Sequence, residues 1–322
     1  MSVIAFAKNW NGKFKNSSYE LVSYTKELAN KLNTNLVVLS IGEVANEELN
    51  TLGKYGADKV VAVNDPQLNT LTSRAYAKVI SQVADKEGAT VVVLSDNNSG
   101  KAISPRVSVQ MRAGMVAAVQ EMPVSFDPFV VKKRVFSGKA FGHVQIDSEK
   151  KVLTIAKNCF GLIENKLDVV IEEFTPEVDA NLFKVQVIEE EEQKNKVILS
   201  DADIVVSAGR GMRSSENWGP VEDLAEVLGA ATACSRPVSD EGWRGHEEHV
   251  GQTGKVIAPN LYIAAGISGA IQHVAGISRS KCIVAINTDP EAPIFSVADY
   301  GIVGDVMEVL PKITEAIRNS KS

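Results

Sequence analysis

Turns that follow strand-like runs in the second half of the chain carry the residues best suited to chemistry. Residues 203–208 run into Gly-Arg-Gly at 209–211, and residues 231–235 run into Arg236. Glycine lets the backbone approach a pyrophosphate, and arginine neutralises its charge. The carboxyl end of a parallel strand is also where open α/β sheets bind ligands. Both turns therefore predict ligand contacts, and the alternative is a structural turn whose arginine binds water or backbone carbonyls.

Two more turns have the same composition. Residues 250–255, Val-Gly-Gln-Thr-Gly-Lys, place a hydroxyl between two glycines, where it can approach a planar ligand. Residues 261–273 run from a strand through the Gly-Ile-Ser-Gly of 266–269 into a helix, whose first N–H groups predict an anion site. Gln272 and His273 fall in the first turns of that helix. The histidine is interpreted equally well as a ligand contact or as a structural residue.

A last turn follows the strand-like run 282–287. Asn287 ends this run, and Pro290 and Pro293 fix an extended loop behind it. Asp305 comes just before the final predicted helix. Capping of that helix is the favoured interpretation of Asp305 from its position alone.

Three familiar motifs fail when they are tested. The Gly-x-Gly turn has Ser214 where a dinucleotide fingerprint needs its third glycine, and the next strand ends without an acidic residue for a ribose. A P-loop would need glycine at Ser95 and a hydroxyl at Ala102, so residues 97–101 are predicted to be a helix-entry loop. The His-Glu-Glu-His of 246–249 lacks zinc-site spacing, and we predict no metal site.

The elements that position these turns form two α/β domains. In the first half, Ser17 and Glu20 have capping-box spacing at the start of a helix. Apolar runs separated by helices predict parallel βαβ units. The predicted strands are 3–7, 36–39, 59–63 and 90–94, and the predicted helices begin at 17, 46 and 68 and end near 32, 55 and 84.

After residue 126 the pattern changes. Residues 129–136, 140–145 and 152–156 are extended runs with turns at 137–138 and 147–148, which predict an antiparallel extension of the sheet. The charged stretch 188–196 is predicted to be a solvated connection between domains 1–195 and 196–322. The second domain repeats the βαβ pattern, with strands at 203–208, 231–235, 261–265 and 282–287 and a helix at 306–318.

Composition narrows the classes of function. The 322 residues include 34 basic and 40 acidic ones, and the net charge of −6 disfavours nucleic acid as a ligand. The longest apolar run is far shorter than the roughly 20 residues that span a bilayer, so membrane insertion is not expected. The start lacks signal-peptide features, and the three cysteines lack Cys-x-x-Cys spacing. We expect a reducing compartment, the bacterial cytoplasm, or the mitochondrial matrix for a processed eukaryotic chain.

The turns, in this order and spacing, resemble the α subunit of electron-transfer flavoprotein. The resemblance covers the whole chain and rests chiefly on GRG at 209–211, SRPVSDEGW at 235–243, VGQTGK at 250–255, LYIAAGISGAIQH at 261–273 and INTDPEAPIFSVADYGIV at 286–303. It implies a Rossmann-like C-terminal domain that holds one FAD. It also implies an N-terminal domain that packs with a β subunit carrying AMP. Electrons would arrive from acyl-CoA and related dehydrogenases and leave for a membrane quinone reductase.

The resemblance also implies a set of FAD contacts. Arg210 would meet the phosphates, Arg236 would lie over the isoalloxazine ring, the Thr253 hydroxyl would lie near N5, and His273, protonated or donating, near O2. The full set is Arg210, Ser235, Arg236, Val250, Gly251, Gln252, Thr253, Ser268, Gly269, Ala270, Ile271, Gln272, His273, Asn287, Asp305 and Val306.

Two other functions stay open at this point. One is the α subunit of an electron-bifurcating flavoprotein, which oxidises NADH with a second FAD in β. The other is a non-redox adenine-nucleotide binding module. The resemblance favours an electron carrier without substrate-transforming chemistry, in which the flavin does the redox work.

Overall fold

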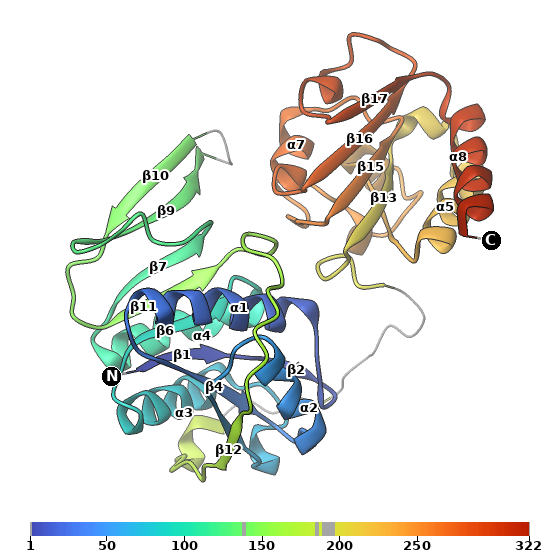
Figure 1. Ribbon diagram of the computed structural model, residues 1–322. Helices are drawn as coiled ribbons and strands as arrows, with labels where there is room; N and C mark the ends of the chain where they lie inside the picture. Colours follow the sequence, from blue (N-terminus) through green and yellow to red (C-terminus); the bar gives the residue numbers. More distant parts are fainter. Residues whose placement is uncertain (1, 137–139, 184–186, 189–196, 322) are drawn as a thin grey trace. The chain divides into compact units, whose positions relative to one another are not determined.

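The computed structural model describes residues 2–136, 140–183, 187–188 and 197–321 (Figure 1). The chain folds as two compact units, 1–190 and 191–322. The predicted boundary near residue 195, the charged residues 189–196 and the predicted turn at 137–138 lie outside the described residues.

The N-terminal unit is built on one large sheet. Its neighbouring strands follow the order β10-β9-β7-β11-β6-β1-β4-β5-β12. The four strands predicted for the first half are present and parallel: β1 (Ser2–Phe6), β4 (Asn35–Ile41), β5 (Lys59–Val63) and β6 (Ala89–Ser95). Near-continuous Val, Ile and Leu runs form such strands because both faces of the sheet are covered.

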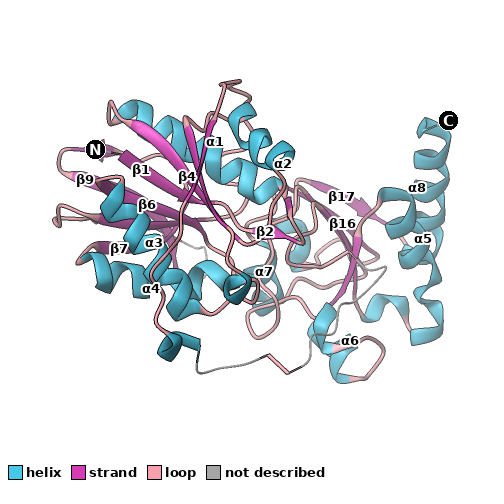
Figure 2. Cartoon of the chain, turned by 90° about the horizontal axis from the view of Figure 1, so that it is seen from below, coloured by secondary structure: helices cyan, strands magenta, loops and turns pink. Residues whose placement is uncertain are grey.

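Helices cover both faces of this sheet (Figure 2). Val3 and Ala5 of β1 pack in one core cluster with α1 (Asn16–Lys31), while Ile4 and Phe6 pack in another with α3 (Ser73–Lys86) and α4 (Asn98–Met111). The alternation follows from the two-residue period of a strand. The helix predicted over 46–55 is α2 (Asn46–Asn50), continued by a 3₁₀ turn over Thr51–Lys54.

The predicted capping box at the start of α1 is wrong. Ser17 lies inside the helix, and the N-cap position is Lys15, whose side chain makes no capping bond. The Glu20 carboxylate is buried and accepts N–H groups from Asn158, Phe160 and Gly161 at 2.9, 2.9 and 3.0 Å. The Glu20 carboxylate therefore binds backbone N–H groups of a loop that is distant in sequence and does not cap the start of α1.

Two other helix starts differ from the prediction. A short 3₁₀ turn, Pro66–Leu68, precedes α3, which begins at Ser73 rather than at residue 68. Asn97 caps α4 by accepting the Gly100 N–H at 2.8 Å, so residues 98–101 form its first turn and not a loop. An asparagine N-cap satisfies one of the N–H groups that the first turn leaves free.

The antiparallel extension is present but shorter than predicted. Strands β9 (Phe129–Val135) and β10 (Ala140–Gln145) pair antiparallel. The third predicted member, β11 (Lys151–Ile155), pairs parallel with β6 and with β7 (Gly114–Val119), a strand not predicted from the sequence. Two short strands complete the sheet, β8 (Ser125–Phe126) and β12 (Val170–Glu173), and a two-strand ribbon, β2 (Asn9–Trp10) with β3 (Lys13–Phe14), lies apart.

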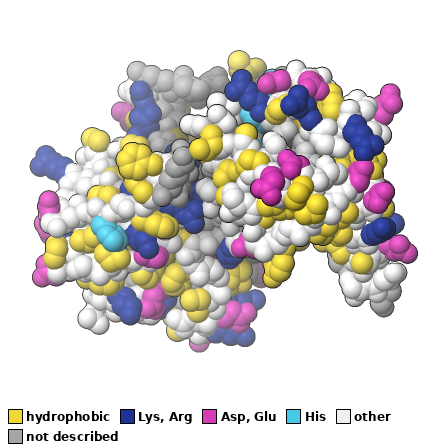
Figure 3. Space-filling model, turned by 90° about the horizontal axis from the view of Figure 1, so that it is seen from above, with side chains coloured by type: hydrophobic (Ala, Val, Ile, Leu, Met, Phe, Trp, Pro, Cys, Tyr) yellow, Lys and Arg dark blue, Asp and Glu magenta, His cyan; other side chains and the backbone are white. Residues whose placement is uncertain are grey.

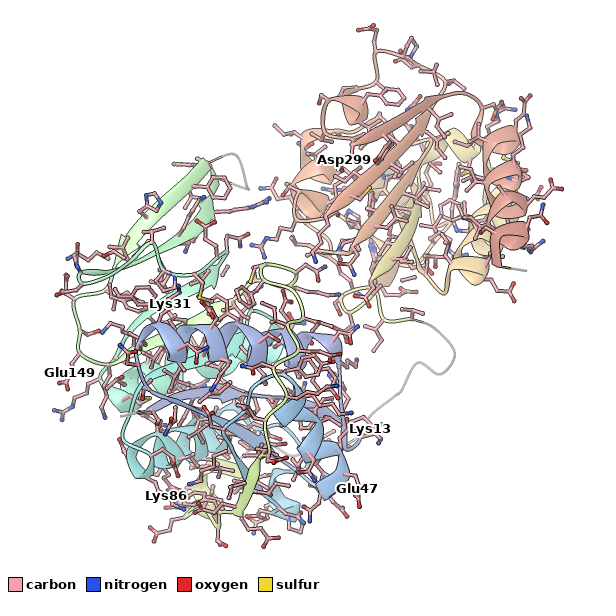
Figure 4. All side chains as sticks on the ribbon, in the orientation of Figure 1. Lys13, Lys31, Glu47, Lys86, Glu149 and Asp299 are labelled. Carbon is pink, nitrogen blue, oxygen red and sulfur yellow. The ribbon has the colours of Figure 1, made fainter. Side chains whose placement is uncertain are left out.

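Opposite charges are interspersed over the face drawn in Figure 3. One exposed cluster joins α3 to β12, where Glu172 pairs with Lys86, labelled in Figure 4, and with Lys59 at 2.6 Å. Hydrogen bonds from the two lysines lower the pKa of Glu172 to about 2. Within the described ranges, no helix is long and apolar enough to cross a membrane.

The C-terminal unit contains a five-stranded parallel sheet in the order β14-β13-β15-β16-β17. Its strands are β13 (Ile204–Ala208), β14 (Ala231–Cys234), β15 (Leu261–Ala265), β16 (Cys282–Asn287) and β17 (Tyr300–Val303). β13 and β14, the first two strands of this unit, lie beside each other, and β15 lies on the other side of β13. The strand order therefore reverses between β13 and β15, at their carboxyl ends.

Helices also cover both faces of this second sheet (Figure 1). α5 (Gly219–Leu228) and α8 (Val306–Lys321) lie on one face, and α7 (Ile271–Ile277) lies on the other. Asp299, labelled in Figure 4, precedes β17 and accepts the Ile283 N–H of β16 at 2.7 Å. The sheet and its helices fix the positions of the turns at the strand ends.

Candidate functional site

A cavity of about 500 Å³ opens at the carboxyl ends of β13, β14, β15 and β16. This is the volume range of small-molecule sites, and it lies at the point where the strand order reverses. Most of the residues predicted from the sequence line it: Arg210, Ser235, Arg236, Val250, Gly251, Gln252, Thr253, Ser268, Ala270, Gln272, His273 and Asn287. Turns separated by up to 77 positions in the sequence therefore share one cavity wall.

Four predicted residues lie outside the lining. Gly269 packs against the backbone of Ile294, and the Ile271 side chain is largely exposed. Asp305 caps α8 by accepting the Met307 N–H at 2.9 Å, and the Val306 side chain is buried in the core under that helix. Contacts of these residues with a ligand stay a prediction.

Glycines let the loops of the cavity approach one another. A Cβ on Gly211 would lie 2.6 Å from the Gly266 Cα, so the loops after β13 and β15 pack backbone against backbone. A Cβ on Gly276 of α7 would likewise lie 2.6 Å from the Gly251 Cα. Real Cβ atoms never come so close to another atom, and only glycine is compatible with these loop positions.

Two arginines place positive charge at the cavity. Arg236 begins α6 (Arg236–Asp240) directly after β14, and its Nε donates to the Asp240 carboxylate at 3.2 Å. Nη1 of Arg210 lies 3.8 Å from Oε1 of Glu241. The two arginine side chains are 61% and 67% exposed, so these pairs are weak and both cations can turn to an anionic ligand.

The imidazole of His273 forms part of the wall and is buried. Its Nε2 lies 2.8 Å from the hydroxyl of Tyr262, in β15. Burial lowers the pKa of His273 to about 4, against a smaller opposing effect of the Val250 carbonyl. The ring is therefore neutral at neutral pH, and of the two predicted states, protonated or donating, only a neutral donor agrees with this burial.

Two polar side chains of the lining were not predicted from the sequence. Asp240 brings a carboxylate to the cavity beside Arg236, and His249 packs its ring against Gly251 and Gly254. Burial lowers the pKa of His249. His249 belongs to the His-Glu-Glu-His stretch, which was weighed only as a metal site and rejected for its spacing. The structure indicates that this histidine supports the loop 250–254.

The cavity suits a ligand with a phosphate portion and a planar ring. Backbone N–H groups of glycine-rich turns and two arginines can hold phosphate, while Ser235, Thr253 and Asn287 offer polar contacts. Within the described chain, His273 Nδ1 is a buried polar atom without a hydrogen bond of normal geometry, and the Val250 carbonyl of the cavity loop is its nearby acceptor. FAD has both of the portions that this donor set requires.

Comparison with known proteins agrees with this assignment. Residues 3–179 match the model of the electron transfer flavoprotein domain, and residues 198–278 match that of the electron transfer flavoprotein FAD-binding domain. Electron transfer flavoprotein subunit alpha of Bacillus subtilis (strain 168) is 37% identical over 98% of this chain and 97% of its own length. The mitochondrial alpha subunit of Dictyostelium discoideum is 34% identical over 99% of this chain and 92% of its own.

A third relative has a different name. Acryloyl-CoA reductase electron transfer subunit beta of Anaerotignum propionicum is 32% identical over 98% of this chain and 95% of its own length. All three similarities extend through both units of the chain. The chain therefore belongs to the electron transfer flavoprotein alpha subunit family, and its C-terminal domain is the FAD-binding domain of that family.

Proposed function

We propose that this chain is the α subunit of a heterodimeric electron-transfer flavoprotein, holding one FAD in the cavity of residues 196–322. The observation that carries the proposal is the meeting of four strand-end turns around this one cavity. FAD supplies the electron chemistry when bound. The protein residues bind and orient it, exclude water from its ring and set the charge around it.

Each part of the cavity has a role in this proposal. Arg210 neutralises phosphate charge, and Ser235 and Asn287 contribute polar contacts. Arg236 and His273 favour negative charge on the N1–O2 side of the isoalloxazine ring, because a positive charge and an N–H donor act strongly in a partly desolvated site. The Thr253 hydroxyl, held between two glycines, donates to or accepts from N5. No residue of the chain makes or breaks a covalent bond.

The N-terminal domain, residues 1–195, packs with a β subunit that carries AMP. Electrons arrive from acyl-CoA dehydrogenases and related enzymes and leave to a membrane quinone reductase, in the cytoplasm of a bacterium or in a mitochondrial matrix. The name of the Anaerotignum relative supports a link to acyl-CoA chemistry. Residues Gly269, Ile271, Asp305 and Val306 would meet FAD at the edge of the cavity.

Cofactor content tests the proposal. The chain is co-expressed with its β subunit, and FAD and AMP are quantified from the absorption spectrum and after extraction. One FAD and one AMP per heterodimer are expected. Two FAD without AMP would instead identify the electron-bifurcating type, for which NADH would then be tried as donor. A colourless complex that extracts only adenine nucleotide would mean a non-redox binding module and would contradict the proposal.

A further inference from the structure

Tyr262 is the one buried side chain in hydrogen-bond contact with a polar atom of His273 among the described residues. Tyr262 is the second residue of β15 and is fully buried, and its hydroxyl is 2.8 Å from His273 Nε2. Burial raises the pKa of this phenol, so its oxygen keeps its proton. A buried O–H group needs an acceptor, since an unsatisfied donor costs about 1–3 kcal/mol.

The surroundings of the hydroxyl leave Nε2 as its acceptor. Ser207 Oγ, the other buried hydroxyl near Tyr262, makes no hydrogen bond of normal geometry within the described part of the chain. A neutral imidazole carries one proton, on either Nδ1 or Nε2. If Nε2 were protonated, it would donate to the phenol oxygen, and the phenol proton would have only Ser207 Oγ near it, which makes no hydrogen bond of normal geometry.

The other nitrogen, Nδ1, belongs to a residue of the cavity wall. It is buried and makes no hydrogen bond of normal geometry among the described residues, and the Val250 carbonyl is the acceptor that favours a proton on this ring. A proton placed on Nδ1 lies beside the Val250 carbonyl, in the loop 250–254 that lines the cavity. A proton placed on Nε2 would lie on the other side of the ring, next to the Tyr262 hydroxyl.

We propose that Tyr262 is a positioning residue that donates to Nε2 of His273, holds the ring in its Nδ1–H form and so directs the one ring proton toward the backbone of the loop 250–254, which lines the cavity. The expected effect on FAD binding rests on the proposed function. The hydroxyl of Tyr262 does not itself touch the ligand. The second partner of a histidine commonly fixes which nitrogen keeps the proton.

Nitrogen-15 NMR of the imidazole tests this directly. The α/β complex is labelled at histidine and measured near pH 7, without FAD and after FAD is added, and His273 is assigned with the variant His273→Gln. The nitrogen coupled to both ring carbon-bound protons is Nε2. It is expected to show the shift of an unprotonated nitrogen in both samples, and Nδ1 the shift of a protonated one, which changes further when FAD binds.

The variant Tyr262→Phe removes only the hydroxyl. Its His273 is expected to lose the fixed tautomer, with signal moving to the Nε2–H form, and FAD binding is expected to weaken about threefold to tenfold, the worth of one hydrogen bond. Tyr76→Phe is the matched control, because Tyr76 is also buried and donates at 2.6 Å to the Leu68 carbonyl, in the N-terminal unit. It should change neither the His273 signals nor FAD affinity.

The outcomes separate this inference from the proposed function. A protonated Nε2 in the wild-type FAD-free complex overturns the inference, and this measurement does not depend on whether Tyr262→Phe folds. An unchanged tautomer in a folded Tyr262→Phe also overturns it. If FAD fails to bind while the FAD-free wild type shows Nδ1–H and the variant loses it, the role of Tyr262 in holding the tautomer is supported and the proposed function is the part that fails.

Discussion

Nη2 of Arg213 lies 2.5 Å from Oδ2 of Asp305, and the other carboxylate oxygen of Asp305 accepts the Met307 N–H at 2.9 Å. The pair joins the loop after β13 to the start of α8. Arg213 has a positive φ of 69°, a backbone conformation that residues other than glycine rarely adopt. Asp305 is therefore a helix cap and a loop anchor, at a position where the family resemblance implies a contact with FAD.

Two substitutions of Asp305 separate these roles. Asp305→Ala removes both the cap and the ion pair and should lower the free energy of unfolding by about 1–2 kcal/mol. Asp305→Asn keeps a side-chain oxygen for the cap and should cost less than about 1 kcal/mol. We expect both to weaken FAD binding, measured by quenching of flavin fluorescence. Wild-type affinity in Asp305→Asn would show that Asp305 acts only as a cap.

The charges of Arg236 and Asp240 should shift the midpoint potential of bound FAD in opposite directions. The first reduction step adds one electron to the ring, so Arg236→Ala should make the potential of that step more negative, on the order of 40 mV for about 1 kcal/mol of lost attraction. Asp240→Asn should make it more positive, because it removes a carboxylate from the cavity wall. Arg236→Lys is the control that keeps the charge. Equal potentials in all four proteins, determined by reductive titration, would rule out this role.

The backbone packing of α7 against the loop 250–254 gives a steric prediction. Gly276→Ala puts a Cβ 2.6 Å from the Gly251 Cα, so the loop must move and FAD affinity should fall at least tenfold, with a loss of about 1–3 kcal/mol of stability. Gly219→Ala is the matched control, because a Cβ there meets nothing within 4 Å. FAD titration and thermal unfolding compare the two. Normal FAD binding by Gly276→Ala would mean that this loop does not hold the ligand.

Burial of His273 predicts a loss of stability in acid. The folded pKa of about 4 lies below the ordinary value of 6.5, so the unfolded chain takes up the proton first as pH falls. Stability from this group is intact above about pH 6.5 and declines toward pH 4. Between pH 7.5 and 5, the FAD-free wild type should lose about 2 kcal/mol more than His273→Gln. Parallel unfolding curves at both pH values would contradict the burial of a neutral ring.

The sequence predicted the fold well where hydrophobic period and turn chemistry agree. Strands β1, β4, β5, β6 and β13 to β16 follow from apolar runs, and the turns after β13, β14 and β15 are marked by glycine or arginine, whereas β7, β12 and β17 were not predicted. Long-range pairing was less predictable: β11 looks like a third antiparallel strand from its neighbours in sequence, but it inserts beside β6. The Ser17–Glu20 spacing was misleading because the Glu20 carboxylate is satisfied by a loop about 140 positions away.

Site residues were predicted where a motif marked them, and missed where their role is packing. His249 supports the loop 250–254 with its ring, and no local spacing reveals such packing. Tyr262 looks like an ordinary aromatic residue of a buried strand, and only the structure places its hydroxyl against His273. The tautomer of a histidine depends on partners that fold together from different elements.

Hydrogen–deuterium exchange of the α/β complex, with and without FAD, tests the central claim most directly. The account predicts that FAD slows exchange of backbone amides in the turns that line the cavity: 209–211, 235–240, 249–253, 266–273 and 287. Amides of the N-terminal sheet serve as the internal reference. Protection absent from these turns, or concentrated elsewhere while FAD is bound, would contradict the assignment of this cavity as the FAD site.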